Sequence, residues 1–219
     1  MEQLIILIIL GVISGFLHTA GYGLYIRMSF TQKIKPHPLT WVMFAYGTLL
    51  LTVLEWDQSA HWTLLILPVV CTTLAFFVAF LCWKRGTLRE PKDKWDIVAF
   101  IADLVLTFMY VSAGLSLYLD LISEETKNAA TIIFLVGSNA TTLTAFWPTL
   151  RGTKKDPHQE HAAPWIIWTC AYIVLGIATL IEAGPWSVLM VYPLMGAVLH
   201  GAVAWLSRSS RQAKFPKTL

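Results

Sequence analysis

Residues 4–27 read LIILIILGVISGFLHTAGYGLYIR, an apolar stretch with no Lys, Arg, Asp or Glu before its last residue, Arg27. As a helix it is long enough to cross a hydrocarbon core of ~30 Å. Six more apolar stretches follow, at residues 39–56, 62–83, 96–119, 129–150, 163–182 and 186–206. Hydrophobic residues make up 56% of the chain and charged residues 13%, which leaves little for a separate soluble domain. The sequence therefore predicts an all-α membrane protein with seven transmembrane helices.

Charged residues alternate between the two ends of these stretches. Fifteen of the sixteen Lys and Arg residues follow the first, third, fifth and seventh stretches, and the exception is Lys127. Because short cytoplasmic loops carry an excess of Lys and Arg, we predict a multi-pass protein of the cell inner (plasma) membrane with its N-terminus outside and its C-terminus in the cytoplasm. The net charge of +3 then reflects topology, and the predicted partner is the lipid bilayer, not nucleic acid.

The chain contains an internal repeat, which is visible when residues 1–84 are laid over residues 125–207. Matched positions lie 124 or 127 residues apart: Ser14 with Ser138, Arg27 with Arg151, Trp41 with Trp168, and Glu55 with Glu182. Each copy holds three helices, so residues 85–124 must cross the membrane once as a connecting helix if the copies are parallel. We expect two parallel three-helix bundles joined by this helix (3+1+3), with a basic cytoplasmic tail at residues 208–219.

This layout, with two short motifs, resembles the PQ-loop superfamily of seven-helix transporters. The motifs are Pro36-His37-Pro38-Leu39-Thr40-Trp41 after the first basic loop, and Trp147-Pro148-Thr149, in which Thr149 stands where the family has Gln. The superfamily includes the SWEET sugar carriers, which are parallel-repeat transporters, the nicotinamide riboside carriers and the KDEL receptors. The chain is similar in particular to uncharacterised bacterial members.

The resemblance implies a transmembrane carrier or facilitator that moves a small polar solute by alternating access around a midplane site. In this architecture the first and third helices of each triplet enclose the solute path, and the connecting helix packs beside the first triplet. The expected hinges are Pro68, Pro148 and Pro193. The alternative is a receptor or assembly factor that keeps the fold without transporting, because one fold hosts several functions. Either protein could be a homo-oligomer.

Polar side chains inside the spans need a reason, because a charged group costs ~2.5–3.5 kcal/mol at the bilayer centre on insertion scales. We predict that the faces carrying them converge on a substrate site formed by Asn139, His18, His200, Thr142, Ser138, Tyr22, Trp41, Trp168 and Tyr172. The alternative for the Ser, Thr, Asn and His residues is hydrogen bonding between helices. The alternative for Trp41 and Trp168 is the aromatic belt at the membrane surface.

Asp103 is the carboxylate that lies well inside a span, and it is the candidate proton relay with His18 or His200, unless it has a structural role. We read Glu55 and Glu182 as solvated helix ends, not as an entrance ring. His158 and His161 form a His-x-x-His loop, which we interpret as a polar connection and not as a metal site. Neither a phosphate-binding loop nor a nucleophile elbow occurs, so we expect no enzyme activity and no cofactor.

Overall fold

The structure is a computed structural model of the 219-residue chain, and it describes residues 1–34, 36–85 and 94–213. Its helices are α1 (Glu2–Phe30), α2 (Pro38–Asp57), α3 (Trp62–Lys84), α4 (Lys94–Tyr118), α5 (Glu124–Lys155), α6 (Ala162–Ala183), the short 3-10 helix η2 (Val188–Met190) and α7 (Val191–Ala213). Within the described ranges, seven helices are long and apolar enough to cross a membrane. The prediction of an all-α membrane protein with seven spanning helices is confirmed. The side chain of Asp103 lies outside the described residues.

Local sequence fixes where the helices begin and end. The side chain of Ser123 accepts a hydrogen bond from the backbone N–H of Thr126 and starts α5. His161 Nδ1 accepts from the backbone N–H of Ala163 at 3.2 Å and starts α6, so this histidine of the His-x-x-His loop has a capping role. Helix α6 ends at Gly184, whose φ of 80° is a conformation that glycine adopts without strain.

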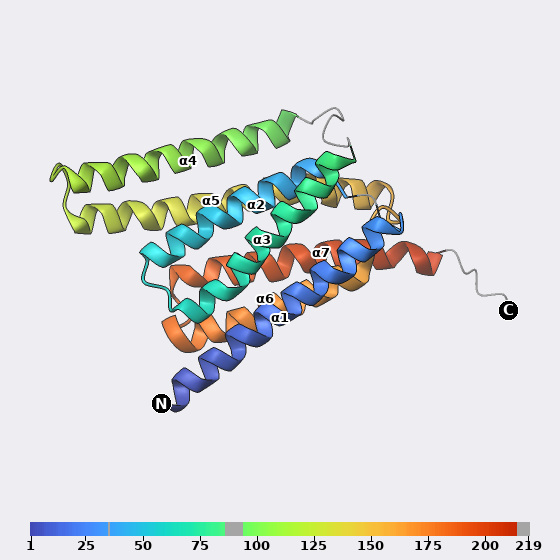
Figure 1. Ribbon diagram of the computed structural model, residues 1–219, viewed down its shortest axis with the longest axis horizontal. Coiled ribbons are helices and arrows are strands. Elements are labelled where there is room, and N and C mark those ends of the chain that lie inside the picture. The colour runs from blue at the N-terminus through green and yellow to red at the C-terminus, as the bar shows by residue number, and fades with distance from the viewer. Residues whose placement is uncertain (35, 86–93, 214–219) are drawn as a thin grey trace.

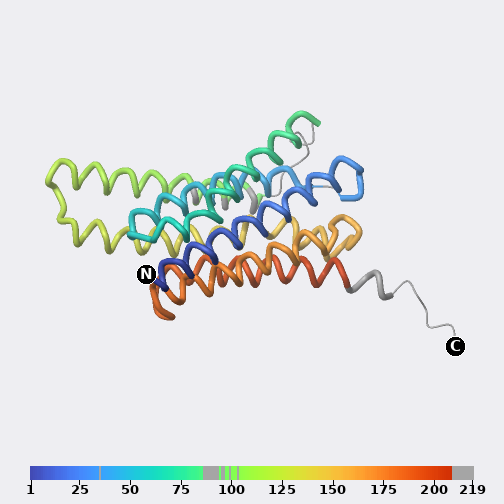
Figure 2. Tube along the Cα trace, turned by 60° about the horizontal axis from the view of Figure 1, so that its bottom comes forward, coloured from blue at the N-terminus to red at the C-terminus, as the bar shows by residue number. Residues whose placement is uncertain are grey.

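Six of the helices form a closed ring, in which each packs against the next in the order α1, α3, α2, α5, α7, α6 and back to α1. Figures 1 and 2 show these helices from the side, running along the length of the molecule. Two core clusters of buried side chains fill this ring, one toward each end of the helices.

Helix α4 lies outside the ring, packed along α5 and touching α2 (Figure 1). The expectation that this helix packs beside the first three helices is therefore wrong, except for its minor contact with α2. The physical reason is the short connection at residues 119–123, which makes α4 and α5 an antiparallel hairpin.

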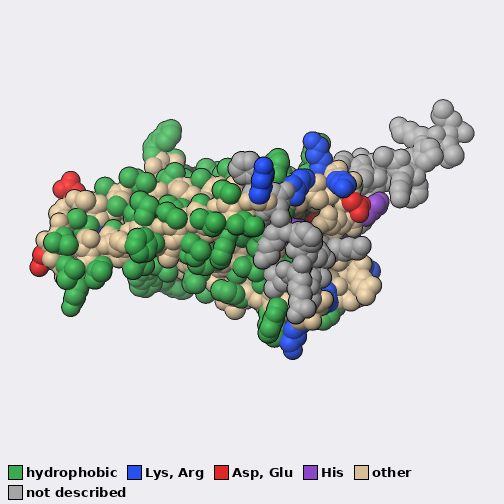
Figure 3. All heavy atoms as spheres, turned by 90° about the horizontal axis from the view of Figure 1, so that it is seen from above, with side chains coloured by type: hydrophobic (Ala, Val, Ile, Leu, Met, Phe, Trp, Pro, Cys, Tyr) green, Lys and Arg blue, Asp and Glu red, His purple; other side chains and the backbone are tan. Residues whose placement is uncertain are grey.

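The outer surface is that of a protein embedded in lipid. Large apolar side chains cover it, among them Phe16, Phe108 and Val198, whose exposed fractions are 71%, 73% and 67%. Figure 3 shows Lys and Arg gathered at one end of the molecule, with acidic and His side chains beside them, acidic side chains without Lys or Arg at the other end, and an apolar band between the two ends. Water-soluble monomers do not expose an apolar surface of this extent, so the chain is a multi-pass membrane protein.

Candidate functional site

A cavity lies in the middle of the ring, and all six ring helices line it. Its wall is aromatic: Tyr22 comes from α1, Trp41 and Phe44 from α2, Phe146 from α5, Trp168 and Tyr172 from α6, and Tyr192 from α7. About 410 Å³ among the lining residues holds no atom, a volume that includes any space open to solvent, and the centre of a water molecule can occupy about 20 Å³ of it. That is room for about one water, so the lining side chains nearly fill the cavity.

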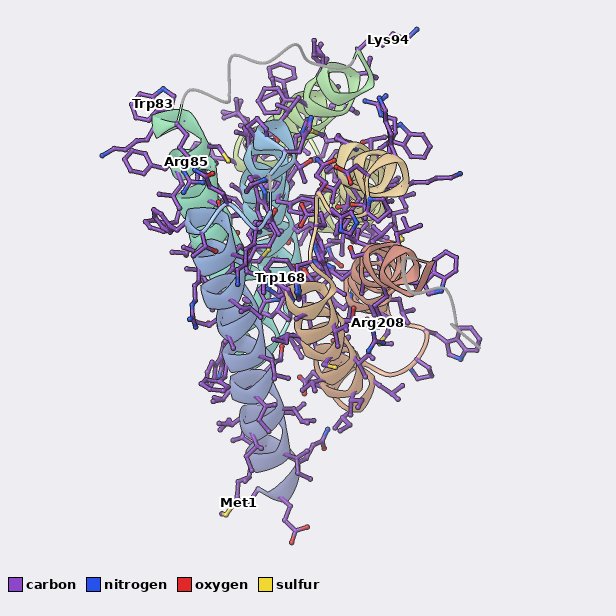
Figure 4. All side chains as sticks on the ribbon, turned by 90° about the vertical axis from the view of Figure 1, so that its right-hand side faces the viewer. Met1, Trp83, Arg85, Lys94, Trp168 and Arg208 are labelled. Carbon is purple, nitrogen blue, oxygen red and sulfur yellow. The ribbon has the colours of Figure 1, made fainter. Side chains whose placement is uncertain are left out.

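Two glycines let these aromatic rings reach the centre. A methyl group on Gly21 of α1 would overlap the indole of Trp168, and one on Gly196 of α7 would overlap the ring of Tyr172. Close approach also brings Trp168 Nε1 to 3.1 Å from the backbone oxygen of His18, to which it donates a hydrogen bond. Figure 4 views the helices from the basic end, with Trp168 between α1 and α6. Gly21 and Gly196 thus allow Trp168 and Tyr172 of α6 to pack closely against α1 and α7 and to line the cavity.

His18 is buried beside the cavity. It is 1% exposed, and among the residues that the structure describes neither Nδ1 nor Nε2 has a hydrogen-bond partner. Its ring centre lies 5.3 Å from that of Tyr22, 5.4 Å from that of Tyr172 and 6.4 Å from that of His200. A neutral imidazole carries one donor and one acceptor, and leaving each unpaired in the interior costs about 1–3 kcal/mol. Such a side chain is suited to meet a polar group of a ligand.

His200 lines the cavity from α7 and has one nitrogen committed. Its Nδ1 lies 2.7 Å from the backbone oxygen of Gly196, so Nδ1 carries a proton and donates it to that oxygen. In the neutral form of this tautomer Nε2 has no proton and is an acceptor. His200 therefore offers the cavity one hydrogen-bond acceptor.

The hydroxyl groups of the wall are paired within the protein. Tyr172 and Tyr192 share a hydrogen bond of 3.0 Å between their hydroxyl oxygens. Tyr22 donates to the backbone oxygen of Cys71 at 3.4 Å, and Thr142 donates to that of Ser138 at 3.2 Å. The wall is thus largely apolar in its chemistry in spite of its hydroxyl groups.

The structure brings most of the predicted substrate-binding residues together, but not all of them. Six line the cavity: Tyr22, Trp41, Thr142, Trp168, Tyr172 and His200. His18 does not line it, but its ring contacts those of three residues that do, Tyr22, Tyr172 and His200. Ser138 and Asn139 are buried and do not line it, and within the described part of the chain the side-chain oxygen of each has no hydrogen-bond partner. Asn139 Nδ2 donates to the backbone oxygen of Leu135 at 2.9 Å.

The two matched tryptophans lie in the core and not at the lipid boundary. Trp41 is 2% exposed and Trp168 is 1% exposed, and their ring centres are 6.0 Å apart. Exposed tryptophans occur instead at the helix ends, with Trp83 at 62% and Trp186 at 98%. The aromatic-belt interpretation therefore fits these exposed residues and not the matched pair.

The three predicted hinge prolines lie in different settings. Pro68 and Pro148 are buried inside α3 and α5. Pro193 lies in the first turn of α7, directly after η2. A proline there removes no hydrogen bond from the helix interior, because the first turn has unpaired N–H groups in any helix.

A buried carboxyl group that sequence reasoning missed lies toward the basic end of the ring, outside the cavity lining. Glu160, in the α5–α6 loop, is 3% exposed. Its two carboxylate oxygens accept hydrogen bonds of 3.0 Å from the Tyr25 hydroxyl and from Trp165 Nε1. Burial raises the pKa of Glu160 to about 8, although both donors act to lower it. A glutamate in a polar loop carries no sequence signal of burial. Its burial is seen only in the structure, where Tyr25 and Trp165 bond to it.

A second buried carboxyl group lies toward the acidic end. Glu55 is 4% exposed and borders a small second cavity with Leu64, Leu175 and Pro193 among others. It stands seven residues after Thr48, which lines the central cavity, so it lies about 10 Å farther along the same face of α2. The prediction of a solvated helix end is wrong for Glu55 because this face points into the ring; its match Glu182 is exposed.

Comparison of the chain with family models, curated proteins and solved structures finds no match. The fold and the site themselves define the class: a seven-helix, multi-pass membrane protein with an aromatic cavity inside a six-helix ring.

Proposed function

We propose that the protein is a carrier or facilitator of a small polar solute, which works by alternating access around the central cavity. The observation that carries the proposal is the buried, unbonded imidazole of His18 beside a cavity that all six ring helices line. An unpaired polar group in the interior destabilises the folded protein. A solute that forms a hydrogen bond with His18 during transport would explain why the protein keeps such a group there.

The proposal includes a division into two parallel triplets, α1–α3 and α5–α7, joined by α4. The packing of the helices supports it. Within the triplets, α1–α3 corresponds to α5–α7 and α2–α3 to α6–α7; between the triplets, α1–α6 corresponds to α5–α2. A two-fold axis along the membrane normal would produce this pairing. We also propose membership of the PQ-loop superfamily on the sequence features given above.

Besides the central hydrogen bond from Trp168 to the backbone of His18, polar contacts between the two triplets lie toward each end. At the basic end Tyr25 bonds to Glu160, and Thr149 donates to Thr40 at 3.3 Å. At the acidic end Asp57 of α2 pairs with Lys127 and accepts a hydrogen bond from Thr131 of α5. A rocking motion can break one set while the other holds, which would open the cavity to one side at a time. Because the cavity has room for about one water, loading a solute requires such an opening.

The rest of the proposal follows from topology. The basic end faces the cytoplasm of the cell inner membrane and the N-terminus lies outside, as the charge distribution favours. The partners are the bilayer and a small-molecule solute, and no enzyme activity is assigned. A receptor on the same fold would bind its ligand without moving it.

The test is transport by the full chain in liposomes, measured with radiolabelled sugars, nucleosides, vitamins, amino acids and amines. In a background without the native cysteines (Cys71, Cys82 and Cys170), a disulfide between Thr40→Cys and Thr149→Cys should lock the basic end. We expect uptake of a transported compound to stop on oxidation and to return on reduction.

The matched control is a disulfide between Thr169→Cys and Gly201→Cys, which joins α6 to α7 within one triplet, at positions where a Cβ on Gly201 would lie 3.7 Å from Thr169 Cγ2. It should leave uptake intact. Equal inhibition by both disulfides would refute the rocking of one triplet against the other. Saturable binding with no uptake of any compound would favour the receptor.

A further inference from the structure

We propose that the solute is a small organic cation, which the aromatic rings of the central cavity bind through cation–π contacts. This rests on the proposed function and names the substrate class of the same cavity. Seven Phe, Tyr and Trp residues line it, from five of the six ring helices, and none of its lining residues in the described part of the chain is Lys, Arg, Asp or Glu. Aromatic faces carry negative partial charge and attract ammonium and guanidinium groups, most strongly where water is excluded.

The geometry of the rings suits a compact cation. Trp168 has four Tyr or Trp neighbours whose ring centres lie between 4.9 and 6.0 Å away: Tyr22, Tyr25, Trp41 and Trp165. Most of these pairs are edge-on or tilted, so the rings do not stack on one another and their faces can turn to a guest when the triplets part. Tyr22, Trp41 and Trp168 line the cavity as one group of rings in mutual contact, with centres 4.9–6.0 Å apart, and these rings must part for a cation to lie between their faces.

A neutral sugar-like solute fits this wall poorly. Such a solute needs many free donors and acceptors, because each of its hydroxyl groups loses water on binding. Here the wall hydroxyls of Tyr172 and Tyr192 bond to each other, and that of Thr142 bonds to the backbone. His200 Nε2 and the nitrogens of His18 are the groups left to accept or donate, which suffices for one or two hydrogen bonds.

The charge along the path favours a cation over an anion. Glu160 lies at the basic end, held by Tyr25 and Trp165, and Tyr25 and Trp165 each stand three residues from Tyr22 and Trp168 of the cavity. Glu55 lies toward the acidic end beside Leu175 and Pro193, within one turn of Tyr172 and Tyr192. Within the described residues neither carboxyl group has a basic partner. Burial raises the pKa of Glu160 to about 8, but a cation near either carboxyl group favours its ionised form and is attracted by it, whereas an anion there keeps the group neutral.

The test compares three probes of one shape and different charge on the purified full chain: choline, its neutral carbon analogue 3,3-dimethylbutan-1-ol, and the anion 3,3-dimethylbutanoate. Melting temperature and calorimetric titration report binding, because a ligand of the folded protein raises its melting temperature. We expect choline, and more strongly benzyltrimethylammonium, to stabilise the protein, with affinity at least tenfold above that of the neutral analogue.

Phe44→Leu tests the rings with little loss of apolar contact. Phe44 is buried in the wall, and its replacement removes one π face, so cation affinity should fall about tenfold. The matched control is Trp186→Leu, at a residue that is 98% exposed, which should bind cations like the parent. The melting temperature of each variant without probe shows that it is folded.

The outcomes separate this proposal from the carrier function. If the neutral analogue or the anion binds as well as choline, the cation proposal is wrong, and uptake in liposomes alone decides the carrier function. If the liposome assay finds an uncharged transported solute, the cation proposal is wrong and the carrier stands. If no probe binds and no compound of the liposome panel is taken up, both are wrong. If cations bind and Phe44→Leu binds them unchanged, the cavity is not their site and the proposal is also overturned.

Discussion

The buried carboxyl group of Glu160 makes a measurable prediction about stability and pH. The perturbation is Glu160→Gln, which removes the charge and nearly keeps the shape. The new amide oxygen can accept from Trp165 Nε1, and its NH2 group can donate to the Tyr25 hydroxyl, so both contacts of the parent have a replacement. The variant should fold and differ from the parent chiefly in its response to pH.

The magnitude follows from the pKa. Burial raises the pKa of Glu160 from its ordinary value of 4.5 to about 8. The folded protein therefore holds a proton that the unfolded chain releases, and the stability from this proton is fully present below pH 4.5 and is lost as pH rises through 8. Between the two pKa values the loss is about 1.4 kcal/mol per pH unit. The slope flattens as pH approaches the folded-state pKa of about 8. From pH 6 to pH 8 the free energy of unfolding of the parent should therefore fall by about 2 kcal/mol, and that of Glu160→Gln should not.

The assay is the melting temperature of the detergent-purified protein at pH 6, 7 and 8. For a chain of this size about 2 kcal/mol corresponds to a shift of about 4–8 °C, so the gap between parent and variant should widen by that amount across the range. Glu182→Gln, at the exposed glutamate of α6, is the control and should follow the parent. If the melting temperatures of the parent and of Glu160→Gln fall by the same amount between pH 6 and pH 8, the carboxyl group is not buried as the structure has it, and the reasoning fails.

Three further predictions concern the ring. Gly21→Ala should destabilise the protein by about 1–3 kcal/mol, because the methyl group would overlap an indole ring, whereas Gly23→Ala, with open space around it, should be neutral or slightly stabilising; melting temperatures distinguish them. His18→Leu should raise the melting temperature by removing two unpaired polar atoms, yet abolish the stabilisation by any solute that binds the parent; retained binding would exclude His18 from the site. Asp57→Asn should lower the melting temperature by a few degrees at low salt and less at high salt, since it breaks the partly buried pair with Lys127; a salt-independent change would contradict this.

The sequence was enough to predict the seven spans and the segregation of charge, because both depend on local composition. A stretch such as residues 4–27 must be a helix in lipid, whatever surrounds it, since every backbone polar group needs an internal partner. Six of the nine predicted substrate-binding residues line one cavity, because polar and aromatic side chains at helical spacing share a face that packing turns inward.

The tertiary structure alone decided which faces meet. The sequence does not say that α4 packs along α5, that Trp41 and Trp168 face each other across the ring, or that Asn139 lies outside the cavity. It also gives no sign that Glu160 and Glu55 are buried while Glu182 is exposed. The physical reason is that hydropathy and charge belong to each segment by itself, whereas burial depends on contacts between helices distant in sequence, which small residues such as Gly21 and Gly196 permit and no local pattern specifies.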